Sequence, residues 1–305
     1  MKKILVDTDV GNDIDDIFAL TYLFSREDAE ILGATTAWGD PRARAACVDV
    51  IARAKGRKFP IYSGYEYNLD GSAKGKIYER YMAFERDNEH GDDFGGGESD
   101  AIDFMYRTIK ENAGEVTLIA IGPLTNVAQL FTRYPDSPSL LSELIVMGGA
   151  YFDNPRCTWD IRAEWNFKCD ARAARIVFDA PVSRIVAVGV DLTWDYQLPR
   201  LDAAKLFGDS PKNAAQRSFA ENVYCGDPIW FHDPIACALA LDESLGEFVK
   251  GEVEIELDDA ELLGKSTLIP KNDGKCLVCK SLKISEDKFY KHFYDVVNKA
   301  KKTTH

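Results

Sequence analysis

Short apolar runs alternate along this chain with polar turns and with stretches whose apolar residues recur every three or four positions. The runs that predict strands span residues 4–6, 29–38, 59–63, 116–121, 142–147 and 184–190. The stretches that predict helices span 17–24, 42–55, 98–111, 170–178, 211–222, 233–241 and 286–298. This repeated order of strand, turn and helix favours a mainly parallel sheet with right-handed helical crossovers.

The last third of the chain is less regular. Residues 252–257 (Glu-Val-Glu-Ile-Glu-Leu) alternate strictly and predict an exposed antiparallel strand, with which residues 276–282 would pair. The chain contains no linker, charge block or internal repeat. We therefore predict one α/β domain over residues 1–305, with helices flanking a mainly parallel sheet and a small antiparallel C-terminal portion.

Residues 65–97 depart from the alternating pattern. They are polar, contain scattered aromatic residues and end in a His90-Gly-Asp-Asp block followed by Phe94 and three glycines. A long irregular segment inside a compact chain is usually functional, and we expect a lid over a binding site.

Composition narrows the choice of partners. The formal charge of −13 argues against nucleic acid polymers and anionic membrane surfaces, and it favours a small neutral or weakly charged substrate. Acid follows too soon after the first residues for a signal peptide, and no apolar run approaches 18 residues, so a soluble cytoplasmic protein is expected. The seven scattered cysteines are expected to be free thiols.

The end of the first predicted strand carries the densest chemistry. Asp7, Asp9, Asp13, Asp15 and Asp16 fall within ten residues around Gly11. The helix dipole accounts for one or two acids in a first turn, but it does not account for those at the strand end. Carboxylates so close repel one another unless a cation lies among them, and a hard divalent ion held by oxygen ligands fits best.

Other polar residues follow the remaining predicted strands or lie at helix starts. They are Asp40, Thr125, Asn126, Glu164, Asn166, Asp191, His232 and Asp233. The carboxyl ends of parallel strands meet at one edge of a sheet, which is where ligands bind in open α/β folds. Acids, amides and one histidine suit a polyhydroxylated ligand gripped by a metal ion and carboxylates.

The order of these motifs resembles the inosine-uridine-preferring nucleoside hydrolase family. The motifs are Asp7-Thr-Asp-Val-Gly with Asp15-Asp16, Gly122-Pro-Leu-Thr-Asn126, Met147-Gly-Gly149, Glu164-Trp-Asn166 and His232-Asp-Pro234. The resemblance runs from residue 3 to about residue 300. It implies a mainly parallel α/β fold, a tightly bound Ca²⁺, hydrolysis of the N-glycosidic bond of ribonucleosides, and assembly as a homodimer or homotetramer.

The resemblance also implies a role for each matching residue. Asp9, Asp16 and Asp233 would ligate calcium through carboxylates and Thr125 through its backbone carbonyl, and Asp9 would be the general base on a calcium-bound water. Asp15, Glu164, Asn166 and Asp233 would hold the ribose. His232 would lie by the leaving base, as a second catalytic residue.

The chain departs from the family pattern in three places and matches it in one more block. Two extra residues separate Gly11 from the paired acids, so Asp13 is an alternative to Asp15 or Asp16. Asp40 stands where the family has asparagine, as a more acidic ribose contact. A longer loop before Glu164 offers Asn154, Thr158 or Asp160 for the ribose 5′-hydroxyl. His90 lies in a block similar to the family's lid and is expected to contact substrate.

Two other functions fit parts of the same pattern. Asp7-Thr-Asp9 at a strand end is also typical of phosphohydrolases that use an aspartyl nucleophile and Mg²⁺, although an acid-rich pocket without lysine would repel phosphate. A calcium-dependent nucleoside-binding protein without turnover is the second alternative, and a base beside the metal argues against it.

Overall fold

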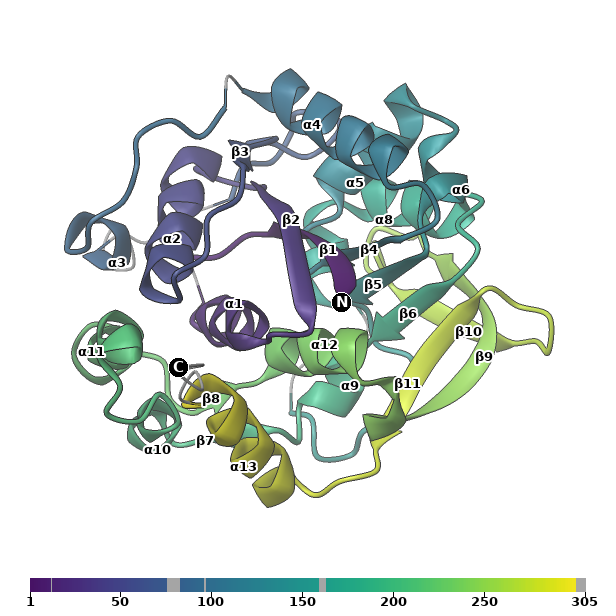
Figure 1. Ribbon diagram of the computed structural model, residues 1–305. Coiled ribbons are helices and arrows are strands. Elements are labelled where there is room, and N and C mark those ends of the chain that lie inside the picture. The colour runs from purple at the N-terminus through teal and green to yellow at the C-terminus, as the bar shows by residue number, and fades with distance from the viewer. Residues whose placement is uncertain (12, 76–82, 96, 159–162, 300–305) are drawn as a thin grey trace.

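The computed structural model describes residues 1–11, 13–75, 83–95, 97–158 and 163–299. A nine-stranded sheet forms its centre (Figure 1). In spatial order the strands are β10 (Ser266–Pro270), β9 (Gly246–Ile255), β11 (Cys276–Leu282), β6 (Ile185–Val188), β5 (Glu143–Met147), β4 (Val116–Ala120), β1 (Lys2–Thr8), β2 (Ala29–Thr36) and β3 (Ile61–Ser63). From β11 to β3 all neighbours are parallel, and β9 alone runs antiparallel to both of its neighbours. The predicted mainly parallel sheet with a small antiparallel C-terminal portion is confirmed.

Helices cover both faces of the sheet (Figure 1). One face carries α1 (Asp15–Ser25), α2 (Pro41–Ala54), α10 (Arg200–Lys205), α11 (Ala214–Asn222), α12 (His232–Leu241) and α13 (Glu286–Val297). The other carries α4 (Glu98–Glu111), α5 (Thr125–Arg133), α6 (Ser137–Leu140) and α8 (Ala171–Asp179). Along β1, Ile4 and Val6 belong to the first core and Leu5 to the second, which is the period-two pattern of a strand buried on both faces.

Shorter elements lie in the connections. Among the described residues they include α3 (Ala83–Arg86), α7 (Trp165–Cys169), α9 (Val190–Thr193), 3-10 turns at Pro211–Asn213 and Glu243–Leu245, and a separate pair of strands, β7 (Gln197–Leu198) and β8 (Ile229–Trp230). In the predicted lid, Phe84 of α3 packs edge-on against Phe219 of α11, with ring centroids 5.3 Å apart. Phe84 and Phe94 thus pack on the α1 side of the sheet, whereas Tyr65 and Leu69, at the start of the same segment, pack against the core of the other face. Within the described ranges no helix is long and apolar enough to cross a membrane.

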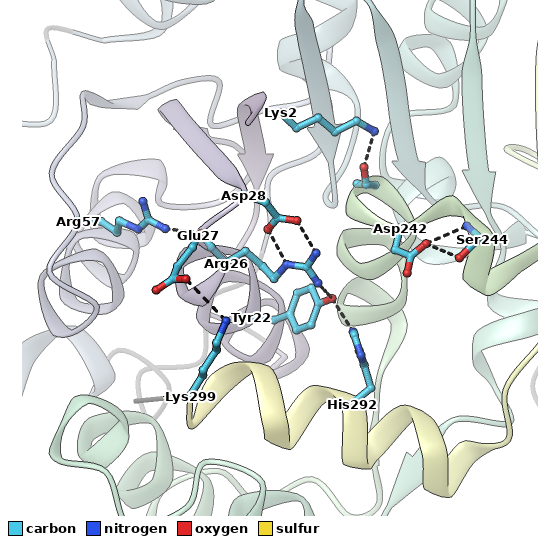
Figure 2. A network of polar contacts seen from close by, with 11 residues as sticks. Lys2, Tyr22, Arg26, Glu27, Asp28, Arg57, Asp242, Ser244, His292 and Lys299 are labelled. Carbon is cyan, nitrogen blue, oxygen red and sulfur yellow. Dashed lines mark hydrogen bonds and ion pairs between the residues drawn. The ribbon is translucent and has the colours of Figure 1, made fainter. Parts of the chain in front are cut away.

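The amino ends of the strands are closed by a polar network (Figure 2). Arg26, just after α1, donates two hydrogen bonds to the carboxylate of Asp28, of 2.8 and 2.6 Å, and a third to the hydroxyl of Tyr22. That hydroxyl lies 2.9 Å from His292 of α13, and the ammonium of Lys2 donates to Glu143. The network joins α1 to α13 at the amino end of the sheet. The candidate ligand-binding residues lie at the opposite, carboxyl end.

Candidate active site

The turn after β1 is held by hydrogen bonds from its own side chains. The hydroxyl of Thr8 donates to Asp16 Oδ1 over 2.5 Å and accepts the amide of Val10 over 3.1 Å. Because Thr8 ends the strand and Asp16 begins α1, this one hydroxyl sets the direction in which the helix leaves the sheet and the position of the Asp16 carboxylate.

Two helix starts bring three carboxylates together. Asp15 and Asp16 begin α1, Asp233 lies in the first turn of α12, and one oxygen from each lies within 4.8 Å of the others. All three are buried, and the amide of Asp233 donates to Asp15 Oδ2 over 3.4 Å. Burial first, and then repulsion between neighbouring carboxylates, raises the pKa of each well above its usual range.

Asp9 borders this cluster from the turn after β1. Its charge acts on Asp15, Asp16 and Asp233, although it is not in the group within 4.8 Å. Burial raises the pKa of Asp9, and the guanidinium of Arg44 opposes that shift. On its other side, a methyl group at Gly122 would come within 2.8 Å of Asp9 Oδ1. The backbone turn after β4 therefore lies in close contact with Asp9, the predicted general base.

Glu164 is fixed by the backbone that surrounds it. It is the N-cap of α7, where its side chain accepts the amides of Asn166 (2.9 Å) and Phe167 (3.1 Å), and it also accepts the amide of Gly149 (2.9 Å). Burial nevertheless raises the pKa of Glu164 to about 7, and Asp9 adds to the shift. Asn166 donates to the carbonyl of Met147 over 3.2 Å. The Gly148-Gly149 turn and α7 therefore form one wall carrying two predicted ribose contacts.

His232 lies at the start of α12, directly before Asp233. Its Nδ1 is 2.6 Å from the hydroxyl of Thr193, so Nε2 is the ring nitrogen left for a ligand. The ring is parallel to that of Trp230, with centroids 6.4 Å apart. Burial lowers the pKa of His232 to about 4, although the charge of Asp13 opposes the shift.

Thr125 begins α5 and is buried. Its hydroxyl donates to Asp170 over 2.8 Å, and Asp170 in turn accepts the amide of Leu69 from the irregular segment. These contacts join the start of α5 to the start of α8 and to the irregular segment. The predicted role of its carbonyl as a calcium ligand stays a prediction.

Three predicted substrate contacts make their hydrogen bonds elsewhere. Asp40 is the exposed N-cap of α2 and accepts the amide of Ala43 over 3.1 Å. His90 is 3.1 Å from Glu85 and bonds to its neighbour Gly91. The roles of Asp40 and His90 stay predictions that these contacts do not support.

The third such contact, Asn154, donates to the carbonyl of Asp191 over 2.7 Å and to Asp195 over 3.3 Å. The carboxylate of Asp191 accepts the amide of Tyr151. Asn154 thus lies beside the end of β6, and its contact with the 5′-hydroxyl stays a prediction. Asp160, one alternative to it, lies outside the described residues.

Asp7 has a separate environment from the other acids of the first motif. Its Oδ1 accepts hydrogen bonds from the hydroxyl of Thr35 (2.6 Å) and the side-chain Nδ2 of Asn126 (2.7 Å), and its Oδ2 is buried with no hydrogen-bond partner among the described residues. Burial raises its pKa to about 7. Asp7 therefore ties together the ends of β1, β2 and β4 behind the carboxylate cluster.

Sequence reasoning missed Arg44, which is fully buried. Its guanidinium donates to the carbonyl of Trp38 over 2.6 Å and to that of Val10 over 3.0 Å, and so joins the turns after β2 and β1. Trp38 has a positive φ of 71°, a strained conformation for a large residue that this bond helps to hold. The sequence did contain a signal for the burial of Arg44. At helical spacing it lies on the same face of α2 as the apolar residues Cys47 and Val48.

The sequence of this chain is similar to those of known proteins. The family model described as inosine-uridine preferring nucleoside hydrolase matches residues 4–291. A protein named probable uridine nucleosidase 2 from Oryza sativa subsp. japonica is 27% identical over 278 residues, covering 84% of this chain and 78% of the relative. The pyrimidine-specific ribonucleoside hydrolase RihA of Salmonella typhimurium is 28% identical over 211 residues, covering 65% and 63%.

Solved structures agree on the fold. A plant nucleoside hydrolase, PpNRh1, superposes with a TM-score of 0.81 at 23% identity over 98% of this chain and 99% of that chain. The inosine-uridine preferring nucleoside hydrolase of Bacillus anthracis superposes with a TM-score of 0.76 at 17% identity over 98% and 100%. The chain belongs to the inosine-uridine preferring nucleoside hydrolase family and is an N-glycosidase.

Proposed function

We propose that this protein hydrolyses the N-glycosidic bond of ribonucleosides to ribose and free base, with Ca²⁺ held by Asp9, Asp16, Asp233 and the carbonyl of Thr125. The observation that carries the proposal is the buried carboxylate cluster of Asp15, Asp16 and Asp233 beside Asp9, at the carboxyl end of the parallel strands.

The donor set fits a hard divalent cation. All side-chain donors in the cluster are carboxylate oxygens, and their mutual repulsion is relieved when a cation lies among them. An oxygen of Asp15 lies within 4.8 Å of oxygens of Asp16 and Asp233, so Asp15 is part of the acidic cluster whether it faces the ion or the ribose. Bound calcium would supply positive charge that favours loss of a proton from the attacking water.

The side chains of this chain would perform the remaining steps. Asp9 takes a proton from water as the water oxygen bonds to the anomeric carbon and the carbon–nitrogen bond breaks. The sugar then resembles an oxocarbenium ion, and the carboxylates of Asp15 and Glu164 stabilise its positive charge. Asn166 holds a ribose hydroxyl. The leaving base gains a proton from solvent water at its nitrogen, on the side of the pocket where Nε2 of His232 lies outside the contact with Thr193.

General base catalysis by Asp9 would account for only part of the rate acceleration. General base catalysis supplies about 10²–10⁴-fold, whereas enzymes commonly accelerate reactions by at least about 10⁶-fold. Most of the acceleration must then come from charge stabilisation and from positioning of the ribose, which is why the buried acidic wall is the central feature of the proposal.

The test measures ribose release from uridine, cytidine, inosine, adenosine and guanosine, after EDTA treatment and again after calcium is restored. We expect calcium-restorable release, and Asp9→Asn should lower kcat by about 10²–10⁴-fold. Asp273→Asn, on a side chain that is 80% exposed, is the matched control, and its activity should equal that of the unmodified protein. Nucleoside bound with calcium but never hydrolysed would support a binding protein instead, and phosphate release from nucleotides would support a phosphohydrolase.

Uridine ranks first among the substrates to be tested, because relatives from rice and Salmonella carry uridine or pyrimidine in their names. A cytoplasmic location and a homodimer or homotetramer complete the proposal. Gel filtration with light scattering tests the assembly directly.

A further inference from the structure

Asp13 is the acid of the first motif that the structure separates from the others. It is exposed, and it is not in the group formed by Asp15, Asp16 and Asp233. Its Oδ1 accepts two hydrogen bonds, from the hydroxyl of Tyr224 over 2.6 Å and from the amide of Ile14 over 2.7 Å. An oxygen with two donors already aimed at it is poorly placed to ligate an ion.

Tyr224 is 211 residues away from Asp13 in the sequence. It follows α11 and precedes β8, which leads directly into His232. The side chain is largely buried, with 8% of its surface exposed. The bond between Tyr224 and Asp13 therefore ties residues 223–228 to the turn that carries the acidic cluster.

The charge of Asp13 also faces the reaction centre. It acts on Asp9, Asp15 and His232, three groups assigned to catalysis or ribose binding in the proposed function. A further negative charge beside crowded carboxylates carries an electrostatic cost. We attribute any favourable effect of Asp13 on the site to the hydrogen bond that it accepts from Tyr224, because O–H···O⁻ bonds of this length are strong.

We propose that Asp13 is a positioning residue: by accepting the hydroxyl of Tyr224 it fastens residues 223–228 against the acidic turn and holds the leaving-base side of the pocket next to the ribose side. This inference rests on the proposed function and deepens it. With Asp13 Oδ1 engaged by Tyr224 and Ile14, the inference assigns the metal ion and the ribose to Asp15 and Asp16.

A double-mutant cycle tests the contact. Asp13→Ala and Tyr224→Phe should each lower kcat/KM for uridine by about tenfold, and the double variant should be no worse than either single one, since both remove the same bond. Asp13→Asn keeps an acceptor oxygen and should recover most of the loss. Calcium affinity, measured by titration calorimetry, should stay within about twofold, whereas loss of a ligand would change it far more.

Hydrogen exchange makes the test independent of turnover. Asp13→Ala and Tyr224→Phe should speed amide exchange in residues 223–228 to the same extent, and the exposed Tyr294→Phe and Asp273→Ala should leave it unchanged. Losses that multiply in the double variant, weakened calcium binding in Asp13→Ala, or unchanged exchange would each overturn the inference. An unmodified protein that releases no ribose but shows the exchange result would overturn the proposed function and leave the Asp13–Tyr224 contact established.

Discussion

Gly122 is the position where the backbone after β4 comes nearest to the carboxylate of Asp9. An added methyl group would meet Asp9 Oδ1 at 2.8 Å and its Cβ at 3.0 Å, so one of the two must move. We expect Gly122→Ala to lower kcat/KM by about 100-fold, because displacements near 1 Å cost that much in a preorganised site. Steady-state kinetics on uridine measures the effect.

Gly91→Ala is the matched control for that substitution. Its added methyl group would come no closer than 3.3 Å to any atom, and the nearest atom is the far end of the Arg53 side chain. Its activity should stay near that of the unmodified protein. Equal activity in the two variants would show that Asp9 is free to shift without cost, which contradicts its role as a fixed base.

Thr8 offers a way to disturb Asp16 without changing a carboxylate. Thr8→Val keeps the shape of the side chain but removes the donor to Asp16 and the acceptor for the amide of Val10. Groups that orient metal ligands are worth about 10–100-fold in affinity, so the calcium dissociation constant should rise by that factor. Titration calorimetry measures it, with Thr8→Ser as the control that keeps the hydroxyl. If both variants bind calcium equally well, Thr8 does not orient a ligand.

The sequence was informative about residues whose chemistry is unusual for their position. Acids at a strand end, such as Asp9, and acids before an apolar helix, such as Asp16, indicate a site by type and spacing alone. Arg44 and Asp7 could not be assigned in the same way, because their partners come from other strand ends and are known only once the sheet order is known.

Helices and strands with a clear period were predicted to within a few residues. The helix predicted at 98–111 is α4 (Glu98–Glu111), and the strand predicted at 116–121 is β4 (Val116–Ala120). The C-terminal strands were less certain because pairing is not local. Residues 276–282 do pair with β9, but with its first half, while Glu252–Ile255 pairs with β10, which no pattern had indicated.

The helix α1 connects the acidic turn to the aromatic core beneath it. Phe18 is fully buried, and its ring centroid lies 4.3 Å from that of Phe207, 5.1 Å from Phe231 and 5.7 Å from Phe293. Phe18→Ala should lower the free energy of unfolding by about 3–5 kcal/mol through the cavity it leaves. Urea denaturation with saturating calcium measures this loss.

Leu201→Ala in α10 is the control for the core substitution, because 54% of that side chain is exposed. It should change the free energy of unfolding by no more than about 0.5 kcal/mol. A similarly small change for Phe18→Ala would mean that the aromatic cluster collapses around the gap, and that α1 depends on its polar contacts instead.

The molecule as a whole places its apolar cores on the two faces of the sheet and its buried acids at one edge. The alternation of strand and helix predicted the class of fold, because strands buried on both faces need helical crossovers. The spatial order of the strands did not follow from the pattern, because every order of parallel strands buries the same runs. That order decides which strand ends are neighbours, and hence which acids meet.

Concentrating acids at one edge makes the stability of the calcium-free protein depend on pH. Burial raises the pKa of Asp7 and Glu164 to about 7 and that of Asp191 to about 6, from ordinary values of 3.8, 4.5 and 3.8. The folded protein thus binds more protons than the unfolded chain between pH 4 and 7, so its stability falls as pH rises, by about 1.4 kcal/mol per pH unit for each such group. His232, with its pKa lowered to about 4, opposes one of these groups below pH 6.5.

In EDTA, then, we expect the unfolding midpoint to fall steadily from pH 5 to pH 7.5. Saturating calcium should raise the midpoint, because an ion that binds only the folded state at 100 times its dissociation constant adds about 2.7 kcal/mol. The rise should be larger at pH 7.5 than at pH 5, since protons compete with calcium for Asp9, Asp16 and Asp233, the proposed ligands, whose pKa values are also raised by burial. Differential scanning calorimetry at matched ionic strength measures both arms, with sodium chloride as the control for general screening. A midpoint that does not change with pH in EDTA, or that responds to sodium as it does to calcium, would mean that the buried acids are neutralised within the fold and that the cluster is not a cation site.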